Sequence, residues 1–168
     1  KGHKSFVVAI AFSPNGQRIL TGSRDKTAKL WDLNSNVIQS FEGHSDDVLA
    51  VAFSSNGQNI LTGSQDETAK LWDLKGNVIQ SFEGHYDDVC TVAFSPNGQS
   101  ILTGSGDRTI KLWDLKGNVI QNFEEHYDDV FTVVFSLNGQ YILTAGDKAA
   151  KLWLSPWAYL DQKVESFS

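Results

Sequence analysis

The 168-residue sequence contains one cysteine, three prolines and no methionine, and its acidic residues outnumber its basic ones. A lone cysteine cannot form an internal disulfide, so a disulfide-stabilised scaffold is excluded and a reducing compartment is favoured. The net charge of −6 provides no general attraction to nucleic acid or to an anionic membrane, and it weakly favours basic partners. No apolar run approaches the roughly 18 residues of a membrane-spanning helix, and the N-terminus has no signal-peptide pattern. We therefore expect a cytoplasmic protein that binds neither nucleic acid nor membranes.

The sequence consists of four copies of one unit. A Trp-Asp pair at residues 31–32 recurs 41 residues later at 72–73 and again at 113–114, and Trp153 follows. The second and third copies are identical at 32 of 41 positions. A fixed period of this length indicates that each unit is one supersecondary element, which buries its apolar surface against its neighbours.

Each copy predicts four short strands separated by turns. The six-residue apolar run 48–53 is typical of a strand that is buried on both faces. The Asn56-Gly57 pair that follows tolerates positive φ and predicts a type I′ hairpin turn, and Asn-Gly recurs at the same point of every copy. Four short strands joined by tight turns form an antiparallel sheet. Because both faces of this sheet are apolar, it cannot exist alone, and successive sheets must stack face to face. The predicted strands of the second copy are 48–53, 59–64, 68–73 and 78–82.

Three motifs carry a resemblance to a known family. They are the Gly-His that opens the first three copies, the Ser-x-Asn-Gly turn, and the string Thr-Gly-Ser-x-Asp-x-Thr-x-Lys-Leu-Trp-Asp. These motifs recur with the period of the copies over residues 2 to about 154, and in this arrangement they resemble the blades of WD-repeat β-propellers. The resemblance implies an all-β fold, a β-propeller of four-stranded antiparallel blades with four blades per chain. We expect one domain over residues 1–168, with blades at approximately 6–41, 47–82, 88–123 and 129–167.

Four such blades are expected to make half of an eight-bladed ring. Propellers have about four to eight blades, and those of the resembled family usually close at about seven or eight. An open arc would leave a bare apolar sheet face at each end, and exposed patches of that size drive association. We therefore expect a homodimer in which two chains close the ring head to tail. A self-closed four-bladed ring and a fragment of a longer chain are the alternatives.

The resemblance also implies a hydrogen-bonded tetrad of His, Thr, Asp and Trp inside each blade. Thr62 and Trp72 are equally far from Glu67 in the turn, so we expect them to face each other across the hairpin. His44 would then connect Thr62 to Asp66, whose carboxylate can also accept from backbone N–H groups. The four expected tetrads are His3, Thr21, Asp25 and Trp31; His44, Thr62, Asp66 and Trp72; His85, Thr103, Asp107 and Trp113; and His126, Thr144, Asp147 and Trp153.

The fourth copy departs from the others. One residue is missing between Thr144 and Asp147, and Leu154 replaces the Asp that follows Trp in the first three copies. The segment 164–167 resembles the outer strand of the earlier copies and is expected to complete the blade.

Recurring His, Asp and Thr could also indicate a metal site or a nucleophilic triad. The candidate metal ligands occur once per blade, however, so they diverge around the ring instead of converging. The Thr of each set lies mid-strand, and no oxyanion donor or strained nucleophile turn accompanies it. Cys90 occupies a position that is apolar in the other copies and is expected to pack rather than react. We expect no catalytic residue, no metal and no cofactor.

The informative positions are those that differ between matching copies. Of the nine differences between the second and third copies, four lie in the loop after His or in the turn at Asp. In the resembled family the rim formed by these loops is the usual partner-binding face, although exposed loops also drift freely. Aromatic residues among acidic ones suit a peptide that carries Lys or Arg. The candidate partner-binding residues are Phe6, Arg24, Ser45, Asp47, Leu49, Gln65, Tyr86, Asp88, Cys90, Tyr127, Asp129 and Phe131.

These features predict a non-catalytic scaffold for protein–protein interaction, which binds a protein or peptide, possibly basic, on its loop face. The alternative is an accessory propeller module of a longer signalling protein whose catalytic domain is absent from this sequence. The lack of Met and a first residue at a repeat boundary favour the alternative.

Overall fold

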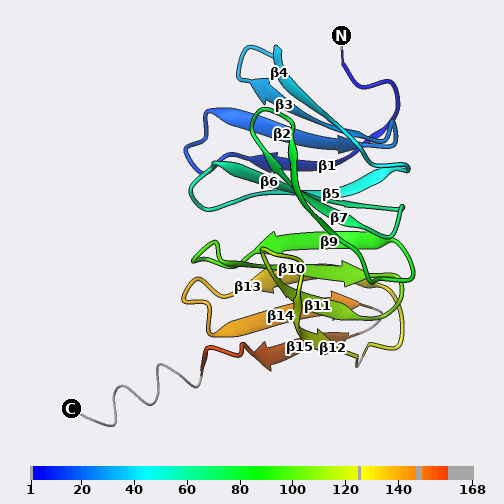
Figure 1. Cartoon of the computed structure of the whole chain (residues 1–168), viewed down its shortest axis with the longest axis vertical. Helices are drawn as coiled ribbons and strands as arrows, with labels where there is room; N and C mark the ends of the chain where they lie inside the picture. The colour runs from blue at the N-terminus through cyan, green and yellow to red at the C-terminus, as the bar shows by residue number, and fades with distance from the viewer. Residues whose placement is uncertain (1, 125, 147–148, 159–168) are drawn as a thin grey trace, which may run out of the picture.

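The computed structural model describes residues 2–124, 126–146 and 149–158, which form four antiparallel β-sheets (Figure 1). The first sheet contains β1 (Val7–Phe12), β2 (Arg18–Ser23), β3 (Thr27–Asp32) and β4 (Val37–Glu42). The second contains β5 (Val48–Phe53), β6 (Asn59–Ser64), β7 (Ala69–Asp73) and β8 (Val78–Phe82). The third contains β9 (Val89–Phe94), β10 (Ser100–Ser105), β11 (Ile110–Asp114) and β12 (Val119–Phe123). The fourth contains β13 (Val130–Phe135), β14 (Tyr141–Gly146) and β15 (Ala149–Leu154).

Within every sheet the strands lie in chain order, and each is antiparallel to the next. This confirms the predicted all-β fold of stacked antiparallel blades. The predicted outer strand at 164–167 lies outside the described residues, and the fourth blade has three described strands.

The turn between the first two strands of a blade is not the predicted type I′ turn. The N–H of Gly57 donates to the carbonyl of Ser54 at 2.8 Å, and of the Asn-Gly pair only Gly57 has a positive φ, 67°. A type I′ turn requires positive φ at both central residues, so this prediction was wrong. The amide oxygen of Asn56 accepts from the Ser54 hydroxyl at 2.8 Å and from the N–H of Gln58 at 3.0 Å. Asn56 thus acts through its side chain, and glycine alone takes the left-handed conformation.

The blades follow one another along the long axis of the molecule (Figure 1). The first strand of each blade packs beside the first strand of the next, and one apolar cluster fills each of the three interfaces. Neighbouring blades approach each other so closely that the contact position on the second strand requires glycine. A Cβ on Gly63 would lie 2.9 Å from both Cγ1 and the carbonyl oxygen of Val89 in the next blade.

The two ends of the stack are open. The described residues of the first and fourth blades do not pack on each other as neighbouring blades do, so these residues do not form a closed four-bladed ring. Each end blade exposes one apolar face, with Ile10 and Phe12 on the first and Leu143 and Leu152 on the fourth. No helix in the described part of the chain is long and apolar enough to cross a bilayer.

Candidate functional site

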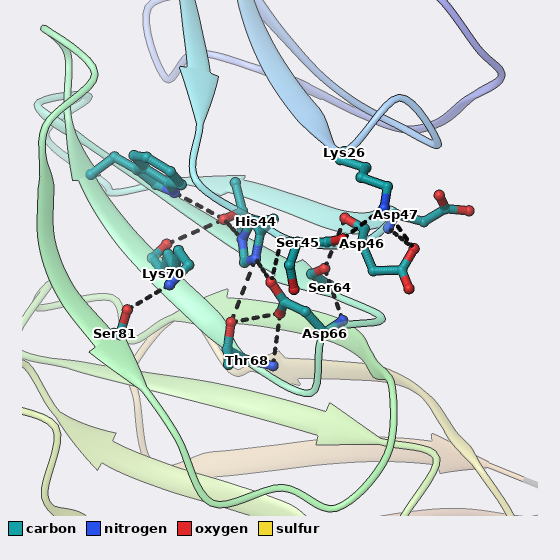
Figure 2. A network of polar contacts seen from close by, with 12 residues as sticks. Lys26, His44, Ser45, Asp46, Asp47, Ser64, Asp66, Thr68, Lys70 and Ser81 are labelled. Atoms are coloured by element: carbon teal, nitrogen blue, oxygen red, sulfur yellow. Dashed lines mark hydrogen bonds and ion pairs between the residues drawn. The ribbon is translucent and has the colours of Figure 1, made fainter.

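The polar set of the second blade lies between the loop that enters β5 and the β6–β7 hairpin (Figure 2). His44 Nδ1 is 2.8 Å from Asp66 Oδ2, and its Nε2 is 2.7 Å from Thr62 Oγ1. Trp72 Nε1 donates to the same Thr62 oxygen at 2.9 Å. With Asp66 ionised, the network assigns the ring proton to Nδ1, so the Thr62 hydroxyl donates to Nε2. The hydrogen bonds then run in one direction, from Trp72 through Thr62 and His44 to Asp66.

The strand register corrects one detail of this set. Thr62 pairs with Lys70 and Trp72 pairs with Ile60, so Thr62 and Trp72 are not directly opposite each other as expected. They are diagonal neighbours, two residues apart in register, and therefore share one face of the sheet. The long indole reaches across this diagonal to the threonine oxygen. Counting from the centre of the turn did not predict this offset.

Asp66 is held in its charged form. Burial alone would raise its pKa, but hydrogen bonds from His44 and the Thr68 hydroxyl, with the attraction of the His44 ring, outweigh burial and hold the pKa of Asp66 well below its ordinary value. Thr68 Oγ1 donates to Oδ1 at 2.6 Å, and the N–H of Ser45 donates to Oδ2 at 3.0 Å. Sequence reasoning missed Thr68 as a member of the set, although Asp-x-Thr recurs at residues 25–27, 66–68 and 107–109.

The first and third blades repeat this geometry. The His–Asp distances are 2.9 Å for His3–Asp25 and 2.8 Å for His85–Asp107. The His–Thr distances are 2.6 Å to Thr21 and 2.7 Å to Thr103. Trp31 and Trp113 donate to these threonines at 2.8 Å. The pKa values of Asp25 and Asp107 are lowered in the same way, against the effect of burial.

In the fourth blade, the described tetrad residues make the His–Thr and Trp–Thr contacts of the other blades. His126 Nε2 and Trp153 Nε1 each lie 2.9 Å from Thr144 Oγ1. The expected member Asp147 lies outside the described residues.

The Asp of each Trp-Asp pair has a separate, local role. Asp73 Oδ1 accepts from the N–H groups of Lys75 and Asn77, both at 2.9 Å, and Oδ2 accepts from the Asn77 side chain at 2.8 Å. The hydrogen bonds from the Asn77 side chain and N–H lower the pKa of Asp73. This carboxylate caps the turn that leads to the outer strand, which Leu154 cannot do in the fourth blade.

The tetrads of the second and third blades are largely buried, whereas that of the first blade is half-buried. Thr62 and Thr103 have no exposed surface, and their oxygens are already engaged by His and Trp. The described residues contain no group of three His, Cys, Asp or Glu side chains that could hold a metal ion. The arrangement joins three parts of a blade: the loop that precedes the first strand, the second strand and the third strand.

Comparison with known proteins agrees with this blade geometry. The family described as WD domain, G-beta repeat, matches residues 1–32, 35–73, 76–114 and 117–153. The chain belongs to this WD-repeat family. Each match ends at or beside the last strand residue of the Trp-Asp strand, or at its Trp in the fourth copy.

The chain is similar to short segments of several WD-repeat proteins. It is 60% identical over 40 residues to nuclear distribution protein PAC1 of Scheffersomyces stipitis, which covers 23% of this chain and 8% of PAC1. It is 54% identical over 35 residues to vegetative incompatibility protein HET-E-1 of Podospora anserina, 21% of this chain and 3% of that protein. It is 53% identical over 36 residues to small ribosomal subunit protein RACK1 of Caenorhabditis elegans, which covers 21% of this chain and 11% of RACK1. These matches span only a small part of each relative's length.

The candidate partner-binding residues of this WD-repeat chain lie around the loops at the tetrad end of the blades. Tyr86 and Tyr127 occupy equivalent positions after the tetrad His and are 85% and 84% exposed. Phe6 and Phe131 are also exposed. Leu49 and Cys90 are half-buried at the second position of β5 and β9. Arg24, Ser45 and Gln65 are exposed, while Asp47, Asp88 and Asp129 are half-buried.

Side chains on this rim make contacts between neighbouring blades that sequence reasoning missed. Lys26 Nζ donates to the carbonyl of Ser45 at 2.7 Å and lies 4.0 Å from Asp46 (Figure 2). Arg24 lies 3.7 Å from Asp47. Between the second and third blades, the Gln65 amide donates to Asp88 at 3.0 Å. These residues are about 20 positions apart in sequence, so only the stacking of blades brings them together.

Cys90 is a packing residue with an unreactive thiol. Burial, followed by the negative charge of Asp88, raises the pKa of the Cys90 thiol to about 11. Its Sγ lies 3.5 Å from the carbonyl oxygen of Asp88.

Proposed function

We propose that this WD-repeat protein is a non-catalytic scaffold that binds a basic peptide segment of a protein partner on its loop face. WD-repeat chains are generally interaction scaffolds and generally non-catalytic, which supports the broad class. The observation that carries the proposal is the pair Tyr86 and Tyr127, which are large, aromatic and almost fully exposed at equivalent positions of adjacent blades. Tyrosine buries a large area at a small entropic loss and is enriched where interfaces concentrate their binding energy.

The charge distribution supports a basic partner and favours a position over the third and fourth blades. Asp46 and Asp47 are near Lys26 and Arg24 of the first blade. Among the described residues, no basic side chain lies within 4 Å of the carboxylates of the equivalent pairs 87–88 and 128–129. Gly106, which has no side chain, stands where Arg24 and Gln65 stand in the earlier blades. Carboxylates that have no basic neighbour among the described residues, next to exposed aromatic rings, favour an incoming Lys or Arg through charge and cation–π attraction.

A contact within the chain shows that the Tyr127 ring can lie beside a cation. The ammonium of Lys151 lies 5.7 Å from the centre of the Tyr127 ring. Because Tyr127 is also 84% exposed, its ring is available for a cation–π contact with a Lys or Arg of a partner.

The proposal is tested with two synthetic peptides of equal length, one rich in Lys and Tyr and one in which every Lys is replaced by Glu. Fluorescence anisotropy should detect binding of the Lys peptide alone, and the affinity should fall steeply as salt is raised. The double variant Tyr86→Ala with Tyr127→Ala should lower that affinity by at least about tenfold. Ile79→Ala is the control, because Ile79 is exposed on the outer strand β8, away from the loop face.

Equal binding of the two peptides would contradict the basic-partner proposal. Unchanged affinity in the tyrosine double variant, with its fold intact by circular dichroism, would contradict the assignment of the loop face.

A second candidate is an accessory propeller module of a longer signalling protein. The observation that favours it is the small share of each relative, 3% to 11%, that the matched segments cover. Sequencing the complete transcript tests it, since a catalytic domain in the same reading frame would establish this role and its absence would remove it.

A further inference from the structure

The two open ends of the stack are the two halves of an interface that occurs three times inside the chain. We define the leading face of a blade as the face that packs on the preceding blade, and the trailing face as the face that packs on the following one. In the second blade the leading face consists of Val48, Val51, Phe53, Ile60, Trp72 and Leu74. In the first blade the trailing face consists of Ala11, Leu20, Ala28, Leu30 and Phe41.

The internal interfaces have one recurrent structure. The Phe of an outer strand packs edge-on against the Trp of the next blade, with ring centres 5.7 Å apart for both Phe41–Trp72 and Phe82–Trp113. Phe123 and Trp153 repeat the contact at 5.0 Å. A trailing face therefore recognises a leading face through the same residue types at every internal interface.

The first blade presents a leading face that nothing covers within the described residues. Ile10 corresponds to the half-buried Val51 and is 76% exposed. Trp31 corresponds to Trp72 but has no Phe ring packed on it among the described residues. Its neighbours Ile19, Thr21, Asp32 and Ser35 line a cavity of about 250 Å³ beside the Trp31 ring.

The fourth blade presents the complementary trailing face. Leu152 corresponds to the buried Leu30, Leu71 and Leu112, yet it is 67% exposed. With Val134, Tyr141 and Leu143 it lines an apolar cavity of about 300 Å³. Apolar faces of this kind on a soluble chain mark interaction sites.

We propose that the occupant of each open face is a second copy of this chain, joined head to tail. The trailing face of one copy packs on the leading face of the other, and the twofold arrangement repeats the contact at the opposite seam. Two copies contribute eight blades, the upper end of the range that closed propellers adopt, whereas three copies would exceed it. The described residues of each chain thus present both faces of the seam, apart from the outer-strand Phe of the trailing face, whose counterpart in the fourth blade lies outside them.

Of the positions at which the seam differs from the internal interfaces, one bears directly on how closely the two blades approach. Gly22, Gly63 and Gly104 occur where each trailing face meets the next blade, and a Cβ on Gly104 would lie 2.7 Å from Thr91 and 2.8 Å from Val130. In the fourth blade this position is Ala145. The Ala145 methyl would face Ile10 of the second copy, so the seam must open by a few tenths of an ångström. The seam is therefore the weakest interface of the ring, which makes the pairing reversible.

Light scattering on the purified chain across a range of concentrations is the first test. The expected mass is twice 18.6 kDa, about 37 kDa, falling toward 18.6 kDa on dilution. A folded monomer at every concentration would overturn the proposal. A mass that keeps rising beyond the dimer would overturn the closed ring.

Three substitutions identify the faces. Ile10→Asp and Leu152→Lys each place a charge on one open face, at a site exposed in the single chain, so the fold should survive and each variant alone should be monomeric. Because each variant keeps the face that the other lacks, an equimolar mixture should form a one-seam complex of about 37 kDa. If either variant dimerised alone, like faces would be pairing, which would overturn head-to-tail packing. If the mixture formed no complex at any attainable concentration, head-to-tail packing would also be overturned. Ile79→Asp, on an outer strand away from both faces, is the matched control and should leave the mass unchanged.

Ala145→Gly tests the seam with a readout that only this geometry predicts. Removing the methyl should tighten the dimer, lowering its dissociation constant by about tenfold. Unchanged or weaker association in a variant that is folded by circular dichroism would overturn the placement of Ala145 at the seam.

Discussion

Replacing Thr103 by Val tests the tetrad at its centre. Valine keeps the size and branching of threonine but removes Oγ1, which accepts from Trp113 Nε1 at 2.8 Å and lies 2.7 Å from His85 Nε2. Thr103 has no exposed surface, and Trp113 and His85 are also buried. Water therefore cannot replace the lost oxygen, and the substitution leaves two buried polar groups without a partner.

The expected loss follows from these two groups. An unsatisfied buried donor or acceptor destabilises a protein by about 1–3 kcal/mol. Two of them give about 2–6 kcal/mol, a large share of a total stability of about 5–15 kcal/mol. For a chain of this length, each kcal/mol lowers the melting temperature by about 2–4 °C. Thr103→Val should therefore lower it by roughly 4–24 °C.

Urea unfolding followed by tryptophan fluorescence, with thermal unfolding by circular dichroism, measures the effect. Ile120→Val in the same blade is the control, since Ile120 is exposed on the outer strand β12 and its change should alter stability by less than about 0.5 kcal/mol. If Thr103→Val were no more destabilising than this control, the tetrad would contribute nothing to stability and its structural role would be refuted.

Three further outcomes are expected. The pKa of Asp107 is lower in the folded chain than in the unfolded one, so its contribution to stability is complete above a pH of about 4 and is lost as the pH falls below that value. In Asp107→Asn, the urea concentration at the unfolding midpoint should therefore vary less between acidic and neutral pH than in the unmodified chain. Gly63→Ala should destabilise by about 1–3 kcal/mol in the same urea assay, because the new Cβ meets Val89 of the next blade at 2.9 Å. Since burial raises the pKa of Cys90 to about 11, iodoacetamide should modify the native chain at pH 8 at least about tenfold more slowly than the urea-unfolded chain.

Much of the fold follows from local sequence. The 41-residue repeat, the apolar runs and the turn residues predicted β5, β6 and β8 with the bounds that the structure has. These features are local because a strand needs only its own apolar pattern and a turn only its own glycine. Even here, side-chain chemistry changed the detail, since Asn56 caps its turn and leaves the left-handed conformation to Gly57.

The candidate site was only partly predictable. The members of the tetrad recur at fixed spacing, but the diagonal placement of Thr62 and Trp72 depends on the register of β6 and β7. The cross-blade contacts of Lys26 with Ser45 and of Arg24 with Asp47 depend on how far one blade is displaced from the next.

The sequence by itself determined that the chain is a series of equivalent blades, because each repeat contains its own strands, turns and polar set. Only the tertiary structure decided which carboxylates on the rim have no cation beside them, and which apolar faces are uncovered, among the described residues. Both depend on what the neighbouring blade brings within a few ångströms. Ile10 and Val51 have equivalent places in their blades, and what separates an exposed residue from a packed one is whether another blade precedes it.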